Sequence, residues 1–575
     1  MISKWNYLPL TSDQKIAEAV LDQRFATVPP ISELLVQRGV TSPEEADRFF
    51  RPSLRDLHDP FLMPDMDKAV NRLNRALGSK EKIMVYGDYD VDGTTAVALV
   101  YKYLQNFYSN IDYYIPTRYE DGYGISTHTI DEFVEQGVGL VIILDCGIKA
   151  IEEIAYAKQK GIDFIICDHH VPDETLPPAA AILNPKLEGC TYPCHDLSGC
   201  GVGFKLMQAF SQSNGIDPAE LYNMLDLVAV SIAADIVPMT DENRIMAYQG
   251  LKRLNANPNL GLRAIIKISQ LLGREITISD VIFKIGPRIN ASGRMQSGKE
   301  AVDLLVARDS ADAMDHARNI DQYNKDRKEL DKTITTEANA IIDARTEEEL
   351  SKKAIVIYNK DWHKGIIGIV ASRLTELYYK PSVVLTLSNG LATGSARSVQ
   401  GFDIYSAVDS CRDLLETFGG HTYAVGLSMK EENIEEFTRR FEKYVSDHIT
   451  DKQLTPLVDI SANISFADIS NDFVALLRKF NPFGPGNPKP VFCTKSVMDF
   501  GTSKLVGKQL EHIKLELVDN TSGKVLNGIA FNMAQYFPHI SSGKPFDICY
   551  TIEDNHHSST PNAIQLLIKD IHIPQ

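Results

Sequence analysis

The stretch that decides the fold is KIMVYGDYDVDGTTAVALVYKYLQNF, residues 82–107. It begins as a short apolar strand that ends in acidic residues, and TTAVALVYKYLQNF continues it with the pattern of a helix. The same alternation follows in GLVIILDCG, IEEIAYAKQKG and IDFIICDHH, between residues 139 and 170. Strands and helices that alternate in this way predict an α/β fold with a parallel sheet covered by helices.

The chain of 575 residues is longer than one hydrophobic core usually supports, so we expect several domains. Between Ser310 and Thr346, apolar residues recur at helical spacing among charged ones, which predicts a long connecting helix. A second alternating region begins at residue 352, and the short strand-like runs after Thr455 predict a small β-barrel. The predicted segments are a lead-in (1–80), a first α/β domain (81–305), the connecting helix (306–348), a smaller α/β domain (349–450) and the barrel (455–575).

Composition predicts a cytoplasmic protein. The amino terminus, MISKWNYLPLTSDQK, lacks an apolar stretch of signal-peptide length, and no later run is long enough for a membrane span. The eight cysteines lie in scattered contexts, which favours free thiols in a reducing compartment. A net charge of −17, taken alone, argues against a nucleic-acid partner. Carboxylates that hold metal ions contribute to that charge, however, and a local basic groove can coexist with an acidic surface.

Three carboxylates follow the first strand at alternate positions. Asp88, Asp90 and Asp92 lie at the carboxyl end of a predicted parallel strand, where the ligands of open α/β sheets bind. Because these carboxylates repel one another, a divalent-metal site would explain their clustering. For this segment alone, a solvated acidic turn or a helix cap is the alternative.

Three further segments carry polar groups of the same kind. VIILDCGI (141–148) ends in Asp145, FIICDHHVP (164–172) runs into Asp168, His169 and His170, and LVAVSIAADIVPM (227–239) contains Asp235. Imidazoles beside carboxylates suit manganese or magnesium, and a carboxylate buried in an apolar run requires a cation or a firm partner. No Gly-x-Ser-x-Gly or Gly-x-x-x-x-Gly-Lys pattern offers a different chemistry, so the four segments together predict a metal centre.

The spacing of these segments resembles the DHH phosphoesterase superfamily, whose third motif is the Asp-His-His at 168–170. The resemblance implies two ions, Mn2+ or Mg2+. Asp90 and Asp145 would hold one, and Asp92, Asp145, His169 and Asp235 the other, with Asp145 bridging, Asp88 adjoining and His170 facing the substrate phosphate. Two cations about 3.5–4 Å apart can activate a water and neutralise the leaving oxygen, so no nucleophilic side chain is needed.

Later stretches narrow the resemblance to the RecJ exonucleases. FGGHTYAVG (418–426), WHKGIIGIVASRL (362–374) and GSARS (394–398) resemble the DHHA1 domain, GPRINASGRM (286–295) and FNPFGPGNPKPVF (480–492) resemble RecJ proteins, and the barrel would be an OB-fold. The resemblance implies that some of the following residues contact the substrate phosphates: Arg118, His170, Arg288, Arg294, Ser395, Arg397 and His421. We expect Arg288 and Arg294 to lie in a glycine-containing loop. Surface salt bridging is the alternative for each arginine.

What the resemblance implies is a single-stranded-DNA-specific exonuclease that proceeds 5′→3′, releases 5′-mononucleotides and serves DNA repair and recombination. Its expected partners are single-stranded DNA, a helicase and a single-strand-binding protein, and it is expected to be a monomer without membrane contact. One alternative is a DHH/DHHA1 phosphodiesterase that acts on short oligoribonucleotides or nucleotide bisphosphates, for which residues after 455 would be dispensable. A second is a catalytically inactive scaffold, which the intact ligand positions disfavour.

A separate cysteine cluster, CTYPCHDLSGC (190–200), has a spacing loosely compatible with zinc. Cys190, Cys194, His195 and Cys200 would be the ligands. Because the cluster lacks paired Cys-x-x-Cys knuckles, we expect free thiols instead. We expect a linker there that passes through Gly199, Gly201 and Gly203 into the helix FKLMQAF.

Overall fold

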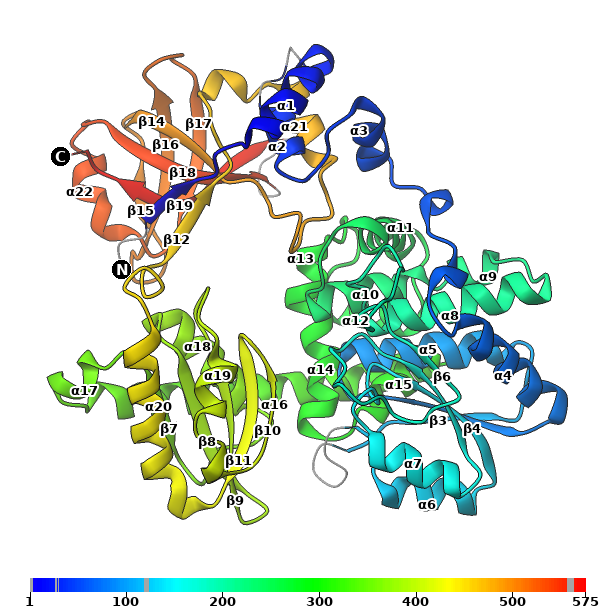
Figure 1. The fold of residues 1–575 in the computed structure, drawn as a ribbon. Helices are drawn as coiled ribbons and strands as arrows, with labels where there is room; N and C mark the ends of the chain where they lie inside the picture. Colours follow the sequence, from blue (N-terminus) through cyan, green and yellow to red (C-terminus); the bar gives the residue numbers. More distant parts are fainter. Residues whose placement is uncertain (1–3, 26–27, 29, 118–123, 556–562, 575) are drawn as a thin grey trace. The chain divides into compact units, whose positions relative to one another are not determined.

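A computed structural model of the chain describes residues 4–25, 28, 30–117, 124–555 and 563–574. The described chain divides into two units, one formed by residues 53–454 and the other by residues 1–52 together with 455–575 (Figure 1). Each unit has hydrophobic cores of its own. Among the described residues, no helix is both long enough and apolar enough to cross a membrane.

The amino-terminal part of the unit 53–454 is a parallel sheet of five strands in the order β3-β2-β4-β5-β6. The strands are β2 (Lys82–Gly87), β3 (Ile111–Tyr114), β4 (Val138–Leu144), β5 (Asp163–Cys167) and β6 (Ala181–Leu183). Helices α4 (Met66–Ser79), α5 (Val91–Gln105) and α8 (Gly199–Asn214) cover one face, and α6 (Thr127–Glu135) and α7 (Ile151–Gln159) cover the other. Both faces are therefore buried, which explains why the central strands β2, β4 and β5 are nearly continuous apolar runs.

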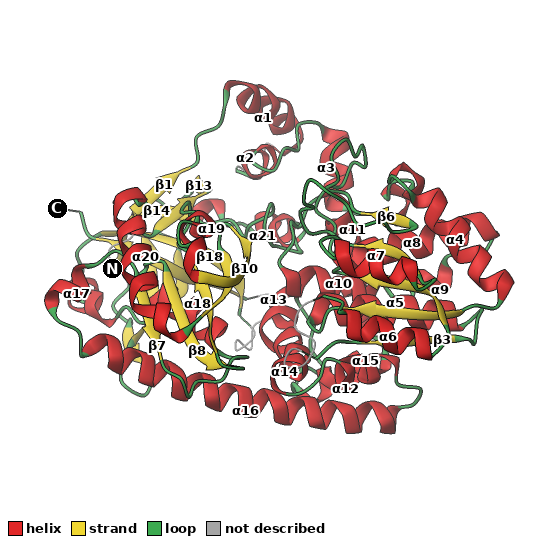
Figure 2. Ribbon diagram, turned by 60° about the horizontal axis from the view of Figure 1, so that its bottom comes forward, coloured by secondary structure: helices red, strands yellow, loops and turns green. Residues whose placement is uncertain are grey.

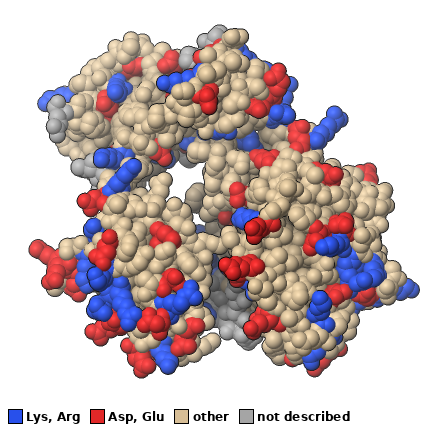
Figure 3. Space-filling model, viewed as in Figure 1, with Lys and Arg blue, Asp and Glu red and all other residues tan. Residues whose placement is uncertain are grey.

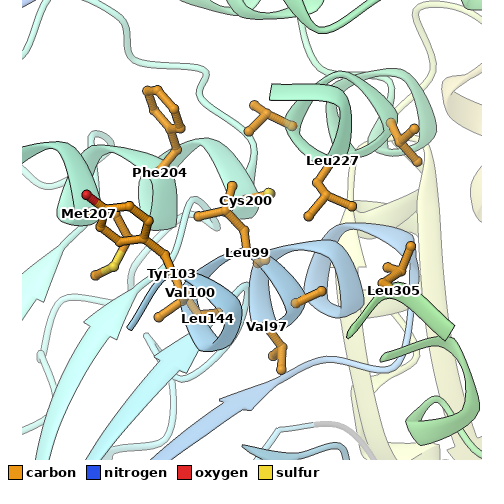
Figure 4. Close-up of a cluster of buried hydrophobic side chains, with 14 of the residues drawn as sticks. Val97, Leu99, Val100, Tyr103, Leu144, Cys200, Phe204, Met207, Leu227 and Leu305 are labelled. Carbon is orange, nitrogen blue, oxygen red and sulfur yellow. The ribbon is translucent and has the colours of Figure 1, made fainter. Parts of the chain in front are cut away.

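A layer of helices packs on α5 and α8. Its members are α9 (Ala219–Tyr222), α10 (Leu225–Asp235), α11 (Asp241–Ala256), α12 (Leu260–Ile268), α13 (Ile278–Asp280), the π-helical turn η3 (Val281–Ile285), α14 (Gly286–Met295) and α15 (Lys299–Val306). Figure 4 shows the centre of this core, where Leu99 of α5, Cys200 of α8 and Leu227 of α10 lie together. The core holds the amino-terminal ends of α5 and α8 in fixed positions at the sheet edge.

The predicted connecting helix is α16 (Ser310–Asp343), which is 34 residues long and unbroken (Figure 2). It leads to a mixed sheet of five strands in the order β10-β11-β9-β8-β7. These strands are β7 (Ile355–Tyr358), β8 (Ser382–Ser388), β9 (Leu391–Arg397), β10 (Leu415–His421) and β11 (Ala424–Met429), and the helices around them are α17 (Glu347–Ser351), α18 (Ile367–Tyr378), α19 (Ile404–Asp409) and α20 (Ile434–His448). Two cores lie on opposite faces of this sheet, one under α18 and one under α19 and α20.

The second unit contains a closed five-stranded barrel in which β14, β18, β19, β17 and β16 pair in a ring and β16 pairs back to β14. The elements after residue 455 are β12 (Leu457–Ile460), β13 (Ala462–Asn463), α21 (Asn471–Arg478), β14 (Phe492–Asp499), β15 (Lys504–Val506), β16 (His512–Asp519), β17 (Val525–Ala530), α22 (Phe537–Ile540), β18 (Phe546–Asp554) and β19 (Ile564–His572). Only β17 and β19 pair in parallel within the ring, which is the strand order of an OB-fold.

Residues 4–50 pack against this barrel. Strand β1 (Lys4–Tyr7) pairs in parallel with β12, and α1 (Ser12–Phe25), α2 (Ile31–Val36) and α3 (Pro43–Phe50) share a core with α21. The amino-terminal segment is therefore an integral part of the barrel unit. A parallel pairing between residues more than 450 positions apart leaves no local pattern in the sequence, which is why it was not predicted.

Two expectations about local structure were wrong. GPRINASGRM is the helix α14, not a loop, because Pro287 is accommodated in the first turn and the glycines serve close packing. The segment from Gly199 is likewise the first turn of α8, which Ser198 caps, and not a linker. In both places the glycine permits a close approach, of the Tyr89 backbone to Gly293 and of the Asp145 side chain to Gly199.

Candidate metal centre and phosphate site

The loop between β2 and α5 carries the first three carboxylates. Asp90 caps α5, since its Oδ1 accepts a hydrogen bond from the Gly93 N–H at 3.1 Å, so the helix-cap alternative is also correct. A Cβ on Gly93 would lie 2.4 Å from the Asp88 carbonyl oxygen, which explains the glycine. Asp92 is buried and accepts hydrogen bonds from the Gly199 and Cys200 N–H groups at the start of α8. The loop is thus fixed to two helix amino termini, which favour negative charge.

Asp145 follows β4 in the left-handed backbone region, with φ 59°. Asp and Asn tolerate this conformation better than most residues. The Asp145 N–H still donates to Cys167 O, so β4 remains paired up to this residue. A Cβ on Gly199 would lie 2.6 Å from the Cβ of Asp145, so α8 directly abuts the carboxylate.

Asp168 organises the Asp-His-His turn. Its Oδ1 accepts hydrogen bonds from the N–H groups of His169 and His170 and from Nδ1 of His170, and its Oδ2 accepts one from Ile148 N–H. Burial alone would raise the pKa of Asp168, but the hydrogen bonds and charge of His170 lower it to about 2. The carboxylate therefore holds the turn and orients the His170 ring with Nε2 pointing away from it.

His169 lies at the centre of the acidic cluster. Its Nε2 is 3.2 Å from Asp145 Oδ1, 3.5 Å from Asp235 Oδ2 and 3.8 Å from Asp92 Oδ2. Burial and the neighbouring carboxylates raise the pKa of Asp145 well above its ordinary value. Such a concentration of buried like charge is costly unless cations neutralise it.

The donor set fits divalent cations. Three groups of ligand atoms, each within 4.8 Å of one another, share members: Asp88, Asp90 and Asp145; Asp92, His169 and Asp235; and Asp145, His169 and His170. Carboxylate oxygens with one or two imidazoles suit Mn2+ and Mg2+. Asp145 belongs to two of the groups, and its Oδ1 lies 3.2 Å from Nε2 of His169, a member of the third.

Asp235 is not buried inside its apolar run as the sequence suggested. It is the last residue of α10, and its side chain is 29% exposed. A carboxylate at a helix carboxyl terminus faces the negative end of the helix dipole, so it too is stabilised by a cation. Burial, followed by the charges of Asp92 and Asp90, raises its pKa to about 8.

The second sheet of the same unit faces this centre through its histidine. The His421 ring, at the end of β10, stacks on the His170 ring with centroids 6.1 Å apart and planes 12° apart. A cavity of about 590 Å³ lies beside the pair and is lined by Lys149 and Glu153 from one side and Phe418 and Gly420 from the other. Both rings line this cavity, so a ligand that enters it would contact both.

Ser395 and Arg397 lie on β9 next to the amino terminus of α18. Arg397 donates to Ser395 Oγ and to Ala396 O, both at 2.8 Å, and burial lowers its pKa. A Cβ on Gly368, in the first turn of α18, would lie 3.2 Å from both Arg397 and Ser395. Among the described residues Arg397 forms no ion pair, and α18 has no side-chain cap. A guanidinium and a hydroxyl beside the first turn of α18 together form a site that suits an anion.

The remaining predicted arginines have different surroundings. Arg294 donates from a guanidinium nitrogen to Gly365 O at 3.1 Å, in the turn before α18. Arg288 is largely buried and pairs with Asp321 of α16 at 3.0 Å, as the salt-bridge alternative supposed. A phosphate role for Arg288 stays a prediction. Arg118 lies outside the described residues.

The cysteine cluster forms no metal site among the described residues. The eight cysteines form no disulfide, and Cys194 and Cys200 are buried. His195 Nδ1 hydrogen-bonds Pro185 O. Tyr192 of the same stretch instead donates to the buried Glu242, which also pairs with Lys205 at 2.9 Å. The stretch therefore serves packing.

Three segments of the chain match known protein families. Family models match three segments: the DHH family, N-terminal domain at residues 82–232, the DHHA1 domain at 351–447 and the RecJ OB domain at 460–570. The fold and the carboxylate cluster thus define a protein built on a DHH domain, a DHHA1 domain and an OB barrel. This is the fold class that the sequence predicted, and it is confirmed.

The chain belongs to the RecJ family. The single-stranded-DNA-specific exonuclease RecJ of Bacillus subtilis (strain 168) is 36% identical over 573 residues, which are 99% of this chain and 71% of that protein. The crystal structure of RecJ in complex with Mn2+ from Thermus thermophilus matches with a TM-score of 0.83 at 24% identity. The match covers 100% of this chain and 80% of the RecJ chain in that structure. A crystal structure of exonuclease RecJ bound to manganese has a TM-score of 0.58 at 31% identity, over 68% and 96% of the two chains.

Proposed function

We propose that this chain is a single-stranded-DNA-specific exonuclease that removes 5′-mononucleotides from the 5′ end, in DNA repair and recombination. The observation that carries the proposal is the set of three carboxylates around Nε2 of His169, at 3.2–3.8 Å. Membership in the RecJ family supports the substrate class. Digestion of end-labelled single strands tests it.

The metal ligands proposed here combine members of the three groups of ligand atoms. Asp90 and Asp145, with Asp88 adjoining, would hold one ion, and Asp92, Asp145, His169 and Asp235 the other. When bound, the two divalent cations, Mn2+ or Mg2+, supply Lewis acidity and neutralise charge at the scissile phosphate. The exonuclease RecJ at 31% identity is bound to manganese, which supports the choice of ion.

The protein's own groups position the phosphate. Asp168 accepts a hydrogen bond from Nδ1 of His170, which leaves Nε2 to face the substrate phosphate. His421, stacked on His170, approaches the same phosphate from the DHHA1 sheet. A Cβ on Gly420 would lie 2.2 Å from Ala424 O, so the hairpin that carries His421 needs this glycine. These residues hold the substrate between two sheets of one unit.

The 5′-terminal phosphate would bind at the start of α18. Arg397 and Ser395 provide a guanidinium and a hydroxyl. Arg294 is close by, because it donates to Gly365 O in the turn that leads into α18. A terminal phosphate carries more negative charge than an internal diester, so a buried guanidinium distinguishes it from other phosphates. Recognition of this end would give the enzyme its 5′→3′ direction.

The barrel offers a surface for the rest of the strand. On β16 the odd-numbered residues face the core, while His512, Lys514 and Glu516 face outward. Lys504 of β15 stands directly opposite Lys514, and neither lysine has an ion-pair partner among the described residues. Like charges opposite each other destabilise a sheet, and a bound phosphate would relieve this repulsion.

Two exposed aromatic residues flank the lysines. Phe531, 52% exposed, forms an edge contact with His512 at 5.0 Å, and Phe500, 56% exposed, donates its N–H to Glu516 O beside β16. Aromatic rings next to basic residues suit single strands, because bases stack while phosphates pair. Figure 3 shows that acidic and basic side chains are interspersed on the face it presents, so the net charge of −17 does not make that face uniformly acidic.

Replacing both Phe500 and Phe531 with Ala is expected to weaken binding to a long single strand by about 5- to 150-fold for each stacked base lost, while kcat on very short strands stays within about two-fold. The reason is that stacking provides binding energy remote from the chemistry. Equilibrium binding and single-turnover kinetics measure the two effects.

The matched control is Phe107→Ala, which removes an exposed ring beyond the far end of α5. It should change neither quantity. If the double variant lost activity on very short strands as strongly as binding to long ones, the barrel surface would have been assigned wrongly. Binding that did not weaken with salt would also contradict it.

We further propose the domain limits 81–305, 349–450 and 455–575, with 306–348 as the connecting segment that contains α16 and with the amino-terminal segment joined to the barrel. The three family matches lie within these limits. Family membership is also the support for a cytoplasmic monomer that works with a helicase and a single-strand-binding protein. No observation on the described residues favours the alternative that the protein acts on short oligoribonucleotides.

A further inference from the structure

Helix α14 contains a side chain that holds the metal-binding loop and to which no role has been given. Asn290 accepts, through Oδ1, a hydrogen bond from the Val91 N–H at 3.1 Å. Val91 lies between Asp90 and Asp92 and is the first residue of α5, whose N–H has no partner within its own helix. Asn290 thus fixes the backbone that connects ligands of the two proposed ions.

Two glycines bring the same segment against this loop. A Cβ on Gly293 would lie 2.4 Å from the Tyr89 carbonyl oxygen, and a Cβ on Gly298 would lie 2.9 Å from the Tyr89 Cα. Both contacts are with backbone, which cannot move aside as a flexible side chain would. Helix α14 and the residues after it therefore lie directly on the loop from Asp88 to Asp92.

The carboxyl end of α14 touches the phosphate site. Arg294 donates to Gly365 O at 3.1 Å, and a Cβ on Gly365 would lie 2.5 Å from the Arg294 carbonyl oxygen. Gly365 belongs to the turn that leads into α18, whose Gly368 abuts Ser395 and Arg397. One short helix thus contacts both the metal loop and the anion site.

The helix is held firmly along its side. It lies beside α16 in both views (Figures 1 and 2), and Arg288 pairs with Asp321 of that helix. The π-helical turn η3 precedes α14 directly, and such turns are frequent at functional sites. A helix anchored on one side and in contact at two places acts as a rigid spacer.

We infer that α14 is a strut that sets the separation between the metal carboxylates and the terminal-phosphate site, and so determines that the first phosphodiester bond from the 5′ end is cut. The inference rests on the proposed function. Asn290, Gly293 and Gly365 are its positioning residues. A displacement of about 1 Å between a substrate anchor and the reacting groups can cost about 100-fold in rate, so a fixed spacer has a direct effect on where and how fast the chain is cut.

The first variant tests the metal end. Asn290→Ala is expected to weaken Mn2+ binding in the absence of DNA by about 10- to 100-fold, as loss of a group that orients metal ligands does. Its control is Asn255→Ala, because Asn255 Oδ1 also accepts a backbone N–H, that of Ile276 at 2.7 Å, in the loop after α12. The control should bind Mn2+ like the wild type. Thermal melting of both variants reports the stability that each loses.

The second variant tests the phosphate end. Gly365→Ala should leave Mn2+ binding within about two-fold of wild type, because the carboxylates are untouched, and should reduce the preference for a 5′-phosphate over a 5′-hydroxyl by at least about ten-fold. On a strand labelled at its 5′-phosphate it should release dinucleotide beside mononucleotide. Gly78→Ala is the control, since a Cβ there meets nothing within 4 Å.

The outcomes separate the two claims. Suppose that wild type releases labelled mononucleotide and that both variants also release only mononucleotide, with wild-type Mn2+ affinity and end preference. The proposal that α14 is a strut would then be wrong, while the proposed function stands. If Asn255→Ala lowers Mn2+ affinity as much as Asn290→Ala, the effect is general instability and the strut is again wrong. If wild type releases no nucleotide from the 5′ end, the proposed function itself fails.

Discussion

Replacing Asp145 with Asn is expected to lower the rate of DNA hydrolysis by more than about 100-fold. This exceeds the loss expected when a residue that only orients metal ligands is replaced. The carboxylate groups with Asp88 and Asp90 and also lies 3.2 Å from Nε2 of His169, so we expect its removal to affect both proposed ions. Asn retains the shape of the side chain and tolerates the backbone φ of 59°. The variant therefore tests charge and ligation without imposing backbone strain.

The same substitution should not destabilise the metal-free fold. In wild type, burial and four neighbouring carboxylates raise the pKa of Asp145, which reflects repulsion that the neutral amide removes. The melting temperature in EDTA should equal or exceed that of wild type. Added Mn2+ should raise the melting temperature of wild type and have a much smaller effect on the variant, because binding to the folded state stabilises it.

Single-turnover kinetics with Mn2+ and calorimetric melting measure the two results. Asp112→Asn, which changes an exposed carboxylate on β3 of the same sheet, is the control and should match wild type in both. Activity of the Asp145 variant within a few-fold of wild type would show that this carboxylate does not bridge two ions.

Replacing Arg397 with Ala is expected to lower kcat/KM on a 5′-phosphorylated strand by at least about 30-fold, since truncating one partner of a buried charge pair costs about 2–5 kcal/mol. Arg397 has no carboxylate partner among the described residues, so the phosphate would be its counter-ion. A strand with a 5′-hydroxyl should be affected much less. The preference for the phosphorylated end should therefore disappear.

Competition between 5′-phosphorylated and 5′-hydroxyl strands in one reaction measures this preference. Arg439→Ala is the control, because this exposed arginine of the same DHHA1 part pairs with Glu436 on the surface. Arg397→Lys should recover only part of the loss, since an ammonium cannot form the two parallel bonds of a guanidinium. An equal loss of kcat/KM on both strands would show that Arg397 does not recognise the 5′-phosphate.

The sheet and its acidic edge could be predicted because their signals are local. An apolar strand that ends in a polar residue shows both the strand and the place where the polar group lies, as in β4 with Asp145. Parallel strands bring such ends to one edge, so the meeting of Asp92, Asp145 and His169 followed from the pattern. The connecting helix was predicted for the same reason, from helical spacing within a single stretch.

What could not be predicted depends on contacts between distant residues. The parallel pairing of β1 with β12 and the ion pair of Arg288 with Asp321 leave no trace near either partner. Gly293 and Gly199 resembled turn glycines, whereas each allows a helix to approach another backbone or a carboxylate. Asp235 seemed buried because its neighbours are apolar, but those neighbours form α10 and the aspartate ends that helix.

Cleavage of single-stranded DNA from its 5′ end is the property on which the other proposals depend. A time course with Mn2+ on one single strand, labelled at the 5′ end in one sample and at the 3′ end in another, tests it directly. We predict that the 5′ label appears at once as mononucleotide, while the 3′-labelled strand shortens progressively. Release of mononucleotide first from the 3′ label, or cleavage confined to oligonucleotides of a few residues, would contradict it.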